Sequence, residues 1–355
     1  MTTEPRPSEP ARLEGLDLDA LDRHLRSEGI PRSGDLRAEF ISGGRSNLTF
    51  LIADDASKWV LRRPPLHGLT PSAHDMAREY KVVAALQNTA VPVARAVTMR
   101  NDDSVLGAPF QMVEYVPGRV IRHTNELEAL GGKDEIDACV DALIKVLADL
   151  HALDPEEVGL GDFGKPTGYL ERQVKRWGGQ WELVRRDIDG GDERDDDVKR
   201  LHSALGEAIP PQRRSAIVHG DYRIDNTMLD ATDPAKVLAV LDWEMSTLGD
   251  PISDAALMCV YRHPMFNLVH ADAAWASPLI PTADELAQRY SVASGQPLDH
   301  WDFYMGLAYF KLAIIAAGIA YRGRVGGADA EFVTMVDDAV APLIAAGLEA
   351  VSRRA

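Results

Sequence analysis

Apolar residues in the first third of the chain recur at two spacings, which predict a helix followed by strands. Leu18, Leu21 and Leu25 repeat every three or four residues, so we expect an amphipathic helix within residues 16–30. The apolar runs that follow are short and are separated by polar or glycine-containing turns, as in strands. These runs predict strands within residues 38–54 (two strands joined by a turn), 58–64, 93–100 and 108–118.

One helical segment is inserted among these strands. Residues 71–87 are predicted to form a helix, because Ser72 and Asp75 match the capping-box spacing that opens many helices. The first hundred or so residues should therefore form a β-rich lobe that contains one inserted helix.

The apolar pattern changes to helical spacing after Pro117 and Gly118. Apolar residues then step along one helix face at Ile136, Val140, Leu143, Leu147 and Leu150. Further helices are expected within 170–208, with "DIDGGDERDDD" (187–197) as a solvated loop, and from about 300 to 353. The longest apolar run, 312–321, is about half the length that crosses a bilayer, so we expect a buried helix there.

These patterns together predict an α+β protein with two lobes. A chain of 355 residues is too long for one small core. We expect a Pro-rich disordered tail over 1–15, an N-terminal lobe over 16–115, and a mainly helical C-terminal lobe over 116–355.

Composition and charge narrow the choice of partners. A hydrophobic content of 45% predicts a folded core, and the formal net charge of −17 argues against binding to nucleic acid or to an anionic membrane. The polar N-terminus lacks the apolar core of a signal peptide, which favours a cytoplasmic protein. Cys139 and Cys259 lie far apart within apolar segments, so we expect buried free thiols and no cysteine metal site.

The chemistry is concentrated in "IVHGDYRIDNTMLD" (217–230) and in the "VLDWE" that follows it. Asp221 comes directly after an apolar strand, Asn226 lies five residues further on, and Asp242 ends a second apolar run. Carboxylate and amide oxygens at neighbouring strand ends suit a hard cation such as Mg²⁺ and the phosphates that it carries. One aspartate can then act as a base, so the set has the parts that a phosphoryl-transfer site requires.

These motifs resemble those of known kinases. "HGDYRIDN" has the spacing of the protein-kinase catalytic loop with Gly in place of Arg, and "LDWE" resembles the D-F-G element with Trp243 in place of Phe. Together with the following "GDPISD", they resemble the aminoglycoside phosphotransferase family, which includes other small-molecule kinases. The resemblance extends over about residues 38–320 and implies a two-lobed protein-kinase-like fold that uses ATP and Mg²⁺.

The resemblance implies roles for the polar residues of the C-terminal lobe. Asp221 would be the catalytic base that accepts the proton of the acceptor hydroxyl. Asn226 and Asp242 would hold Mg²⁺, and His219 would brace the loop. Asp250 and Asp254 would anchor the loop by hydrogen bonds, Asp225 would face away from the site, and an acceptor hydroxyl on a small molecule would take the phosphoryl group.

The N-terminal lobe would bind the nucleotide. Arg62 stands where the kinases have a lysine that contacts the α- and β-phosphates, and its charge and bidentate geometry can serve the same role. Glu79 would pair with Arg62, and Val60, two residues earlier on the same strand face, would lie against adenine.

Two further segments of this lobe are expected to contact the nucleotide. Backbone N–H groups of the turn after the first strand would cradle the β- and γ-phosphates, although the turn is not G-x-G-x-x-G. By position, backbone groups of Val113 and Tyr115 would bind adenine from an edge strand. The turn residues assigned to phosphate binding are Gly44, Arg45, Ser46 and Asn47.

The acceptor stays open among three readings. "GGRSNLTFLI", "VLRRPP", "PSAHDMAREYKV", "SVLGAPF" and "VLDWEMSTLGDP" resemble especially the kinase-like domains associated with acyl-CoA dehydrogenases, which implies a hydroxyacyl-CoA or hydroxy-acid acceptor. Cations for such an anionic acceptor would be available at Arg185, Arg186, Arg213 and Arg214. The alternatives are a true aminoglycoside kinase and a nucleotide-binding pseudokinase regulator. A protein kinase is disfavoured, because no long activation segment or A-P-E follows "LDWE".

Overall fold

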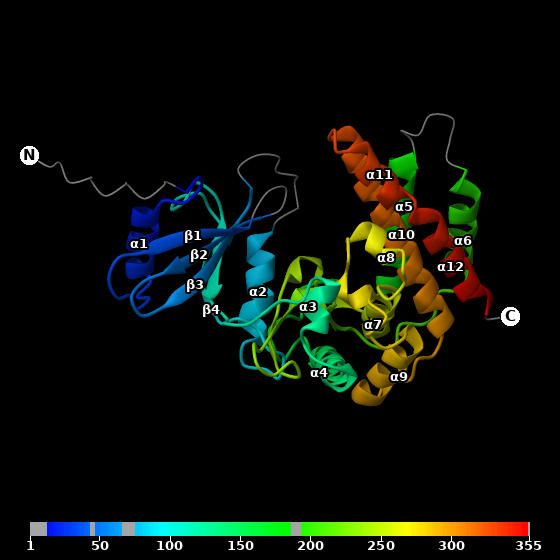
Figure 1. The fold of residues 1–355 in the computed structure, drawn as a ribbon, viewed down its shortest axis with the longest axis horizontal. Coiled ribbons are helices and arrows are strands. Elements are labelled where there is room, and N and C mark those ends of the chain that lie inside the picture. Colours follow the sequence, from blue (N-terminus) through cyan, green and yellow to red (C-terminus); the bar gives the residue numbers. More distant parts are fainter. Residues whose placement is uncertain (1–12, 43–46, 66–74, 186–192, 354–355) are drawn as a thin grey trace, which may run out of the picture. The chain divides into compact units, whose positions relative to one another are not determined.

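The computed structural model describes residues 13–42, 47–65, 75–185 and 193–353 (Figure 1). The chain divides into two compact units. Unit 1 comprises Met1–Gln87 and Ala94–Val116, and unit 2 comprises Asn88–Val93 and Pro117–Ala355. We describe each unit by itself.

Unit 1 is built on a five-stranded antiparallel sheet, as the short apolar runs predicted. The sheet order is β1-β2-β3-β5-β4, so β3 and β5 are interior strands. Val60 on β3 lies opposite Leu51 on β2 and Val113 on β5. The strands are β1 (Arg37–Ser42), β2 (Leu48–Ala53), β3 (Lys58–Arg63), β4 (Ala96–Arg100) and β5 (Phe110–Glu114).

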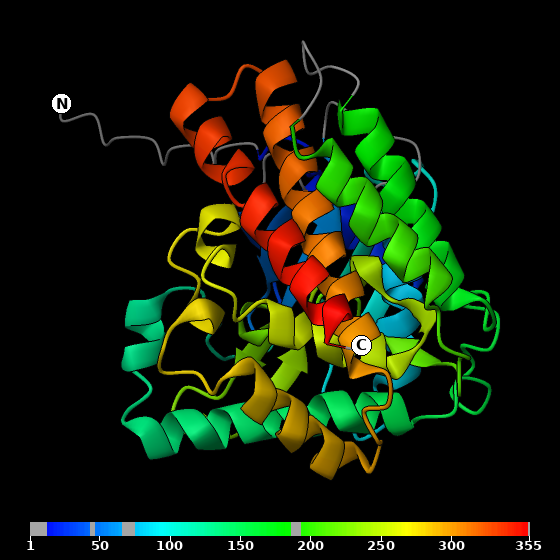
Figure 2. The same cartoon turned by 90° about the vertical axis from the view of Figure 1, so that its right-hand side faces the viewer.

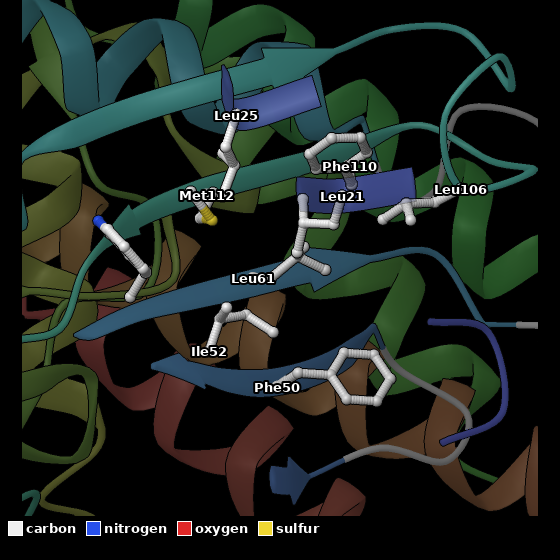
Figure 3. Close-up of a cluster of buried hydrophobic side chains, with 9 residues drawn as sticks. Leu21, Leu25, Phe50, Ile52, Leu61, Leu106, Phe110 and Met112 are labelled. Atoms are coloured by element: carbon white, nitrogen blue, oxygen red, sulfur yellow. The ribbon is translucent and has the colours of Figure 1, made fainter. Parts of the chain in front are cut away.

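The core of unit 1 forms where the predicted first helix covers the sheet. Helix α1 (Leu18–Ser27) begins after Asp17, whose carboxylate accepts a hydrogen bond from the Ala20 N–H. Leu21 and Leu25 are fully buried on its inner face, which confirms the amphipathic helix. Figure 3 shows both leucines pointing toward side chains of β2, β3 and β5. Those partners are Phe50, Ile52, Leu61, Phe110 and Met112.

The inserted helix starts later than its predicted capping box. Helix α2 (Met76–Leu86) has Asp75 as its N-cap, because the Asp75 carboxylate accepts a hydrogen bond from the Arg78 N–H at 3.0 Å. Asp75 therefore caps the helix itself instead of standing inside a box opened by Ser72, and Ser72 lies outside the described residues. Within unit 1, α2 contacts β4 and β5.

Unit 2 is mainly helical, as predicted. The five apolar residues that predicted its first long helix are all buried on α4. The helices of unit 2 are α3 (Thr124–Glu128), α4 (Lys133–Ala152), α5 (Tyr169–Arg185), α6 (Asp195–Glu207), α7 (Pro251–Val260), α8 (Phe266–Val269), α9 (Ala283–Ser294), α10 (Trp301–Val325), α11 (Ala330–Asp337) and α12 (Val340–Ser352).

The acidic segment 187–197 is not entirely a loop. Asp195, Asp196 and Asp197 form the first turn of α6, where negative charge is stabilised by the helix dipole. Asp195 also accepts a hydrogen bond from the Trp181 indole N–H at 2.9 Å. The prediction of a solvated loop was therefore wrong for these three residues, while 187–192 lie outside the described residues.

Helix α10 contains the long apolar run and forms the centre of unit 2. It spans 25 residues, so by length and composition it could cross a membrane, although 78% of its most apolar window is buried inside the structure. Figure 2 shows α10 (orange) running beside α12 (red), which it contacts extensively. The buried helix expected at 312–321 is confirmed, and it extends well beyond that run.

Two small antiparallel ribbons complete unit 2. One pairs β6 (Ala216–Val218) with β9 (Thr247–Gly249), and the other pairs β7 (Thr227–Leu229) with β8 (Val237–Val240). His219 directly follows β6, Asn226 directly precedes β7, and Asp242 lies two residues after the end of β8. The ribbons therefore position the residues on which the predicted chemistry depends.

Candidate active site

The His-Gly-Asp turn follows β6 and requires glycine at its centre. Gly220 has φ +83°, a left-handed conformation that favours glycine. A Cβ at this position would lie 2.7 Å from the Met245 carbonyl oxygen. The turn can therefore approach the Met245 segment closely only because residue 220 has no side chain.

Asp254 of α7 holds the backbone of this turn. Its Oδ2 accepts the His219 N–H at 2.6 Å, and its Oδ1 accepts the Gly220 N–H at 2.8 Å. Burial tends to raise the pKa of the Asp254 carboxyl, but the nearby His151 side chain and the His219 N–H lower it below its ordinary value. Asp254 therefore anchors the loop as an ionised group, in agreement with the sequence prediction.

Asp250 acts on the following helix instead of on the loop. Its Oδ1 accepts the Ile252 N–H at 3.0 Å and so caps α7, while its Oδ2 accepts the Tyr304 hydroxyl at 2.9 Å. Burial raises the pKa of this carboxyl. The prediction that Asp250 anchors the catalytic loop directly was therefore wrong.

His219 links the turn that contains Asp221 to the segment that precedes Asp242 through its imidazole ring. Nδ1 accepts the Asp221 N–H at 3.2 Å, which leaves Nε2 protonated to donate to the Leu241 carbonyl at 2.8 Å. The ring is fully buried and packs against Trp243 with a centroid separation of 4.9 Å. These contacts fit the bracing role that was expected of His219.

The Asp221 carboxylate receives hydrogen bonds on both oxygens. Oδ1 accepts from the Arg223 guanidinium at 2.6 Å and from the Tyr261 hydroxyl. Oδ2 accepts from the Asn226 side-chain amide at 3.0 Å. The side chain is 23% exposed, so it is oriented by the protein and still reachable by solvent or a small molecule.

Arg223 connects Asp221 to a second carboxylate. Its Nε donates to Asp225 Oδ1 at 2.6 Å, and its guanidinium lies over the rings of Tyr261 and Phe266 at 5.1 and 5.4 Å. Burial tends to lower the pKa of Arg223, but Asp221, Tyr261 and Asp225 together outweigh it, so the pKa lies above its ordinary value. The sequence analysis missed Arg223 and Tyr261, although Arg223 is only two residues from Asp221 in the sequence.

Asn226 and Asp242 are brought together by the β7–β8 ribbon. The Leu241 N–H donates to the Asn226 carbonyl at 2.8 Å, next to the ladder pair of these strands. The Asn226 amide nitrogen donates to Asp221, so the carbonyl oxygen of its side chain is the atom that can bind a cation.

Asp242 adopts an unusual backbone conformation and has a second carboxylate nearby. Its φ of +60° and ψ of +63° place it in the left-handed region, which aspartate tolerates better than most residues. Carboxylate oxygens of Asp242 and Glu244 lie within 4.8 Å of each other. This all-oxygen donor set fits Mg²⁺, and Glu244 is a further candidate ligand that the sequence analysis missed.

In unit 1, Arg62 and Glu79 form the ion pair that the resemblance implied. Arg62 Nη1 lies 2.9 Å from Glu79 Oε2, and the Gln111 amide donates to the same oxygen at 2.6 Å. Burial alternates along β3, so Val60 and Arg62 share the face opposite Leu61. The guanidinium is therefore held in a fixed position, with its side chain 27% exposed.

The structure describes only some of the other residues that were predicted to contact the nucleotide. Asn47 is buried directly before β2, whereas Gly44, Arg45 and Ser46 lie outside the described residues. Val113 belongs to the interior strand β5, and the Tyr115 N–H already donates to the Lys58 carbonyl at 3.0 Å. The expectation of edge-strand backbone groups was therefore wrong, because β4 flanks β5 on its outer side.

The arginines proposed for an anionic acceptor are engaged within the protein. Arg185 and Arg213 form ion pairs with carboxylates, and Arg214 donates to a backbone carbonyl. Arg186 lies outside the described residues. Each of the three that the structure describes already has a partner within the protein, and a contact with an acceptor stays a prediction.

The class of protein follows from comparison with known families. Residues 37–304 match the model of the phosphotransferase enzyme family, which contains the aminoglycoside phosphotransferases. The chain belongs to this family, as its HGD and LDWE motifs indicated.

The chain is also similar to part of several longer proteins. The chain is 35% identical over 87% of its length to acyl-CoA dehydrogenase family member 10 of Mus musculus, and covers 29% of that protein. It is 32% identical over 95% of its length to human acyl-CoA dehydrogenase family member 11, and covers 43% of it. The chain thus spans less than half of the length of these relatives.

Solved structures share the whole fold. A candidate aminoglycoside phosphotransferase from Ralstonia eutropha matches with a TM-score of 0.80 and 32% identity, covering 95% of this chain and 98% of that one. The macrolide 2′-phosphotransferase of Brachybacterium faecium matches with a TM-score of 0.55 and 20% identity, covering 92% and 98%. The kinase-like fold predicted from the sequence is confirmed.

Proposed function

We propose that the protein transfers the γ-phosphoryl group of ATP to a hydroxyl group of a small molecule. The observation that carries this proposal is Asp221, a partly exposed carboxylate fixed by donors from Arg223, Tyr261 and Asn226 on a loop of the kinase type. Membership of a phosphotransferase family supports it.

Asp221 is proposed to act as the base. It accepts the proton of the acceptor hydroxyl as the oxygen attacks the γ-phosphorus. The new P–O bond forms while the bond from the γ-phosphorus to the bridging oxygen breaks, and ADP leaves with the electron pair. The protein contributes mainly position and charge, as expected for phosphoryl transfer.

Asn226 and Asp242, with Glu244 as a further candidate, are proposed to hold Mg²⁺ in unit 2. When bound, Mg²⁺ would neutralise charge on the phosphates. The support is the oxygen donor set and the backbone hydrogen bond that fixes Asn226 beside the Asp242 loop. Asn226 would in addition orient Asp221 through its amide nitrogen.

Unit 1 is proposed to bind the nucleotide. Arg62, fixed by Glu79, would contact phosphate oxygens, and Val60 would lie against adenine on the same strand face. Residues 44–47 are retained as proposed contacts. A structural neighbour with 16% identity, a thermostable aminoglycoside phosphotransferase, was solved with AMP-PNP and hygromycin B, which supports a nucleotide together with a small acceptor.

The acceptor is proposed to be a hydroxyacyl-CoA or a hydroxy acid. The support is the similarity to acyl-CoA dehydrogenase family members, whose names refer to acyl-CoA chemistry. A true aminoglycoside kinase is the alternative, favoured by the names of the structural neighbours.

The experiment that tests this function is ADP release from Mg·ATP with hydroxyacyl-CoAs, hydroxy acids and aminoglycosides as acceptors. Asp221→Asn should retain Mg·ATP binding and lose transfer by at least about a hundredfold, the scale of a lost general base. Near-wild-type turnover of this variant would remove Asp221 from the mechanism. Turnover on aminoglycosides alone would select the alternative acceptor, and nucleotide binding without any turnover would favour a pseudokinase.

A further inference from the structure

A lysine reaches the His-Gly-Asp turn from helix α10 of unit 2. Lys311 lies on α10, 91 residues from Gly220, and its Nζ donates a hydrogen bond to the Gly220 carbonyl oxygen at 2.8 Å. This carbonyl belongs to the peptide group whose N–H is that of Asp221. The orientation of that peptide group therefore sets the direction in which the Asp221 side chain leaves the backbone.

The two polar backbone groups of Gly220 are held by opposite charges. Asp254 accepts its N–H at 2.8 Å, and Lys311 donates to its C=O at 2.8 Å. A glycine at φ +83° has wide conformational freedom, so it is the position where a loop would otherwise move most easily. The charged side chains of α7 and α10 thus clamp the most flexible residue of the turn.

Lys311 is partly buried, and an aromatic ring and a small cavity lie beside it. Its ammonium lies over the Trp177 ring at 5.8 Å, and the side chain borders a small cavity of about 20 Å³, which also touches Gln173, Ser253 and Tyr304. A cavity of this size can hold about one water molecule. An apolar side chain here would remove the hydrogen bond to the Gly220 carbonyl oxygen, so the specific contribution of Lys311 is its hold on the turn.

We propose that Lys311 is a positioning residue for phosphoryl transfer, which holds the Gly220 carbonyl and thereby aims Asp221 at the acceptor hydroxyl. The proposal rests on the proposed function, in which Asp221 is the base. Lys311 itself touches neither nucleotide nor acceptor in this scheme.

The groups around Lys311 determine how its hold on the Gly220 carbonyl should change with pH. Burial lowers the pKa of the lysine, Asp221 and Asp254 tend to raise it, and Arg176 lowers it further, so the pKa lies below its ordinary value. The phenols of Tyr169 and Tyr304 beside the same cavity have raised pKa values because of burial and stay protonated. As pH rises, Lys311 loses its proton before an exposed lysine would, and the clamp weakens.

The test compares Lys311→Met with Lys311→Arg and with the surface control Lys199→Met on α6. Lys311→Met should lower kcat by about 10- to 100-fold, the scale of a misaimed catalytic group, and leave the KM for Mg·ATP within about threefold. Lys311→Arg should be at least about threefold more active than Lys311→Met. It should also extend the alkaline limb of the kcat profile upward, because guanidinium stays protonated. Any one of three results would overturn the proposal. The first is a Lys311→Met kcat within about twofold of wild type, the second is an arginine variant no more active than the methionine variant, and the third is an unchanged alkaline limb.

Activity is measured with the acceptor found in the panel, or as Mg·ATP hydrolysis with water if none is found, and Asp221→Asn is run in parallel. An active Asp221→Asn would refute the proposed function, whereas an inactive Asp221→Asn beside an active Lys311→Met would refute the clamp alone. Hydrogen exchange in the peptide 217–223 needs no acceptor. Lys311→Met should speed it about tenfold or more and leave α12 unchanged, and unchanged exchange at 217–223 would also overturn the proposal.

Discussion

At the scale of single residues, the two oxygens of Asp221 are not equivalent. Oδ1 is occupied by Arg223 and Tyr261, while Oδ2 meets only the Asn226 amide among the described contacts of this carboxylate. Oδ2 is therefore the oxygen that we expect to accept the proton of the acceptor. Tyr261 serves this arrangement with a buried phenol whose pKa is raised well above its ordinary value by burial and by the charge of Asp221, so it remains a donor.

Removing the Tyr261 hydroxyl should therefore impair the reaction more than the fold. We expect Tyr261→Phe to lower kcat about tenfold, because Asp221 loses one of its orienting hydrogen bonds, at a cost of about 1–2 kcal/mol. Steady-state kinetics would check this against Tyr309→Phe, whose ring packs on His263 away from Asp221. Equal kcat values for the two variants would show that Tyr261 does not orient the base.

The residues that could be predicted from the sequence are those within the motifs. His219, Asp221, Asn226 and Asp242 lie at fixed spacings that local chain geometry converts into one site. Tyr261 could not be found in this way, because it reaches Asp221 from 40 residues further along the chain, beyond the end of α7. Only tertiary packing creates such contacts.

At the scale of elements, the catalytic turn depends on how closely it approaches the Met245 segment. Gly220→Ala would combine a left-handed backbone with a Cβ 2.7 Å from the Met245 oxygen. We expect a loss of about 1–3 kcal/mol in the free energy of unfolding and a loss of transfer activity. Denaturant unfolding and the ADP assay would measure both.

Gly179→Ala provides the matched control for this substitution. Gly179 lies within α5, and nothing lies within 4 Å of a Cβ placed there. Alanine should therefore stabilise the helix by about 0.4–1 kcal/mol and leave transfer unchanged. If Gly220→Ala behaved like Gly179→Ala, the close approach of the turn would not be needed.

Element prediction succeeded where the apolar pattern was clear, either as a periodic repeat or as a long apolar run, and failed at boundaries that side-chain contacts decide. The strands of unit 1 and helices α1, α4 and α10 follow their apolar patterns. The start of α6 was misplaced because three consecutive aspartates suggest a loop, yet they are also favourable in a first helical turn. The interior position of β5 depends on sheet order, which periodicity alone does not contain.

At the scale of the whole molecule, buried carboxylates make stability depend on pH in both units. Asp54 in unit 1 accepts backbone N–H groups of Ser33, Ala56 and Ser57, which outweigh burial and lower its pKa. Asp254 in unit 2 likewise has a lowered pKa. Stability from such groups is present above their unfolded pKa of about 4 and is lost as pH falls through the folded value.

We therefore expect the free energy of unfolding to fall steeply below about pH 4. Asp250 has the opposite effect, because burial raises its pKa. The slope of the free energy of unfolding against pH therefore reports the sum of these opposing contributions. Denaturant unfolding at pH 7, 5 and 3 would measure it. Asp254→Asn should be less stable at pH 7 and lose less on acidification, and an unchanged slope would show that Asp254 is not ionised in the fold.

The left-handed backbone of Asp242 favours one residue type for stability and another for the proposed metal binding. Glycine would adopt φ +60° without the strain that an aspartate bears there, yet only the aspartate offers a carboxylate. Selection for stability alone would therefore favour glycine at position 242, and a chain changed in this way would lack one of the proposed Mg²⁺ ligands. Aspartate at this turn therefore gives up some stability and provides a proposed metal ligand in return.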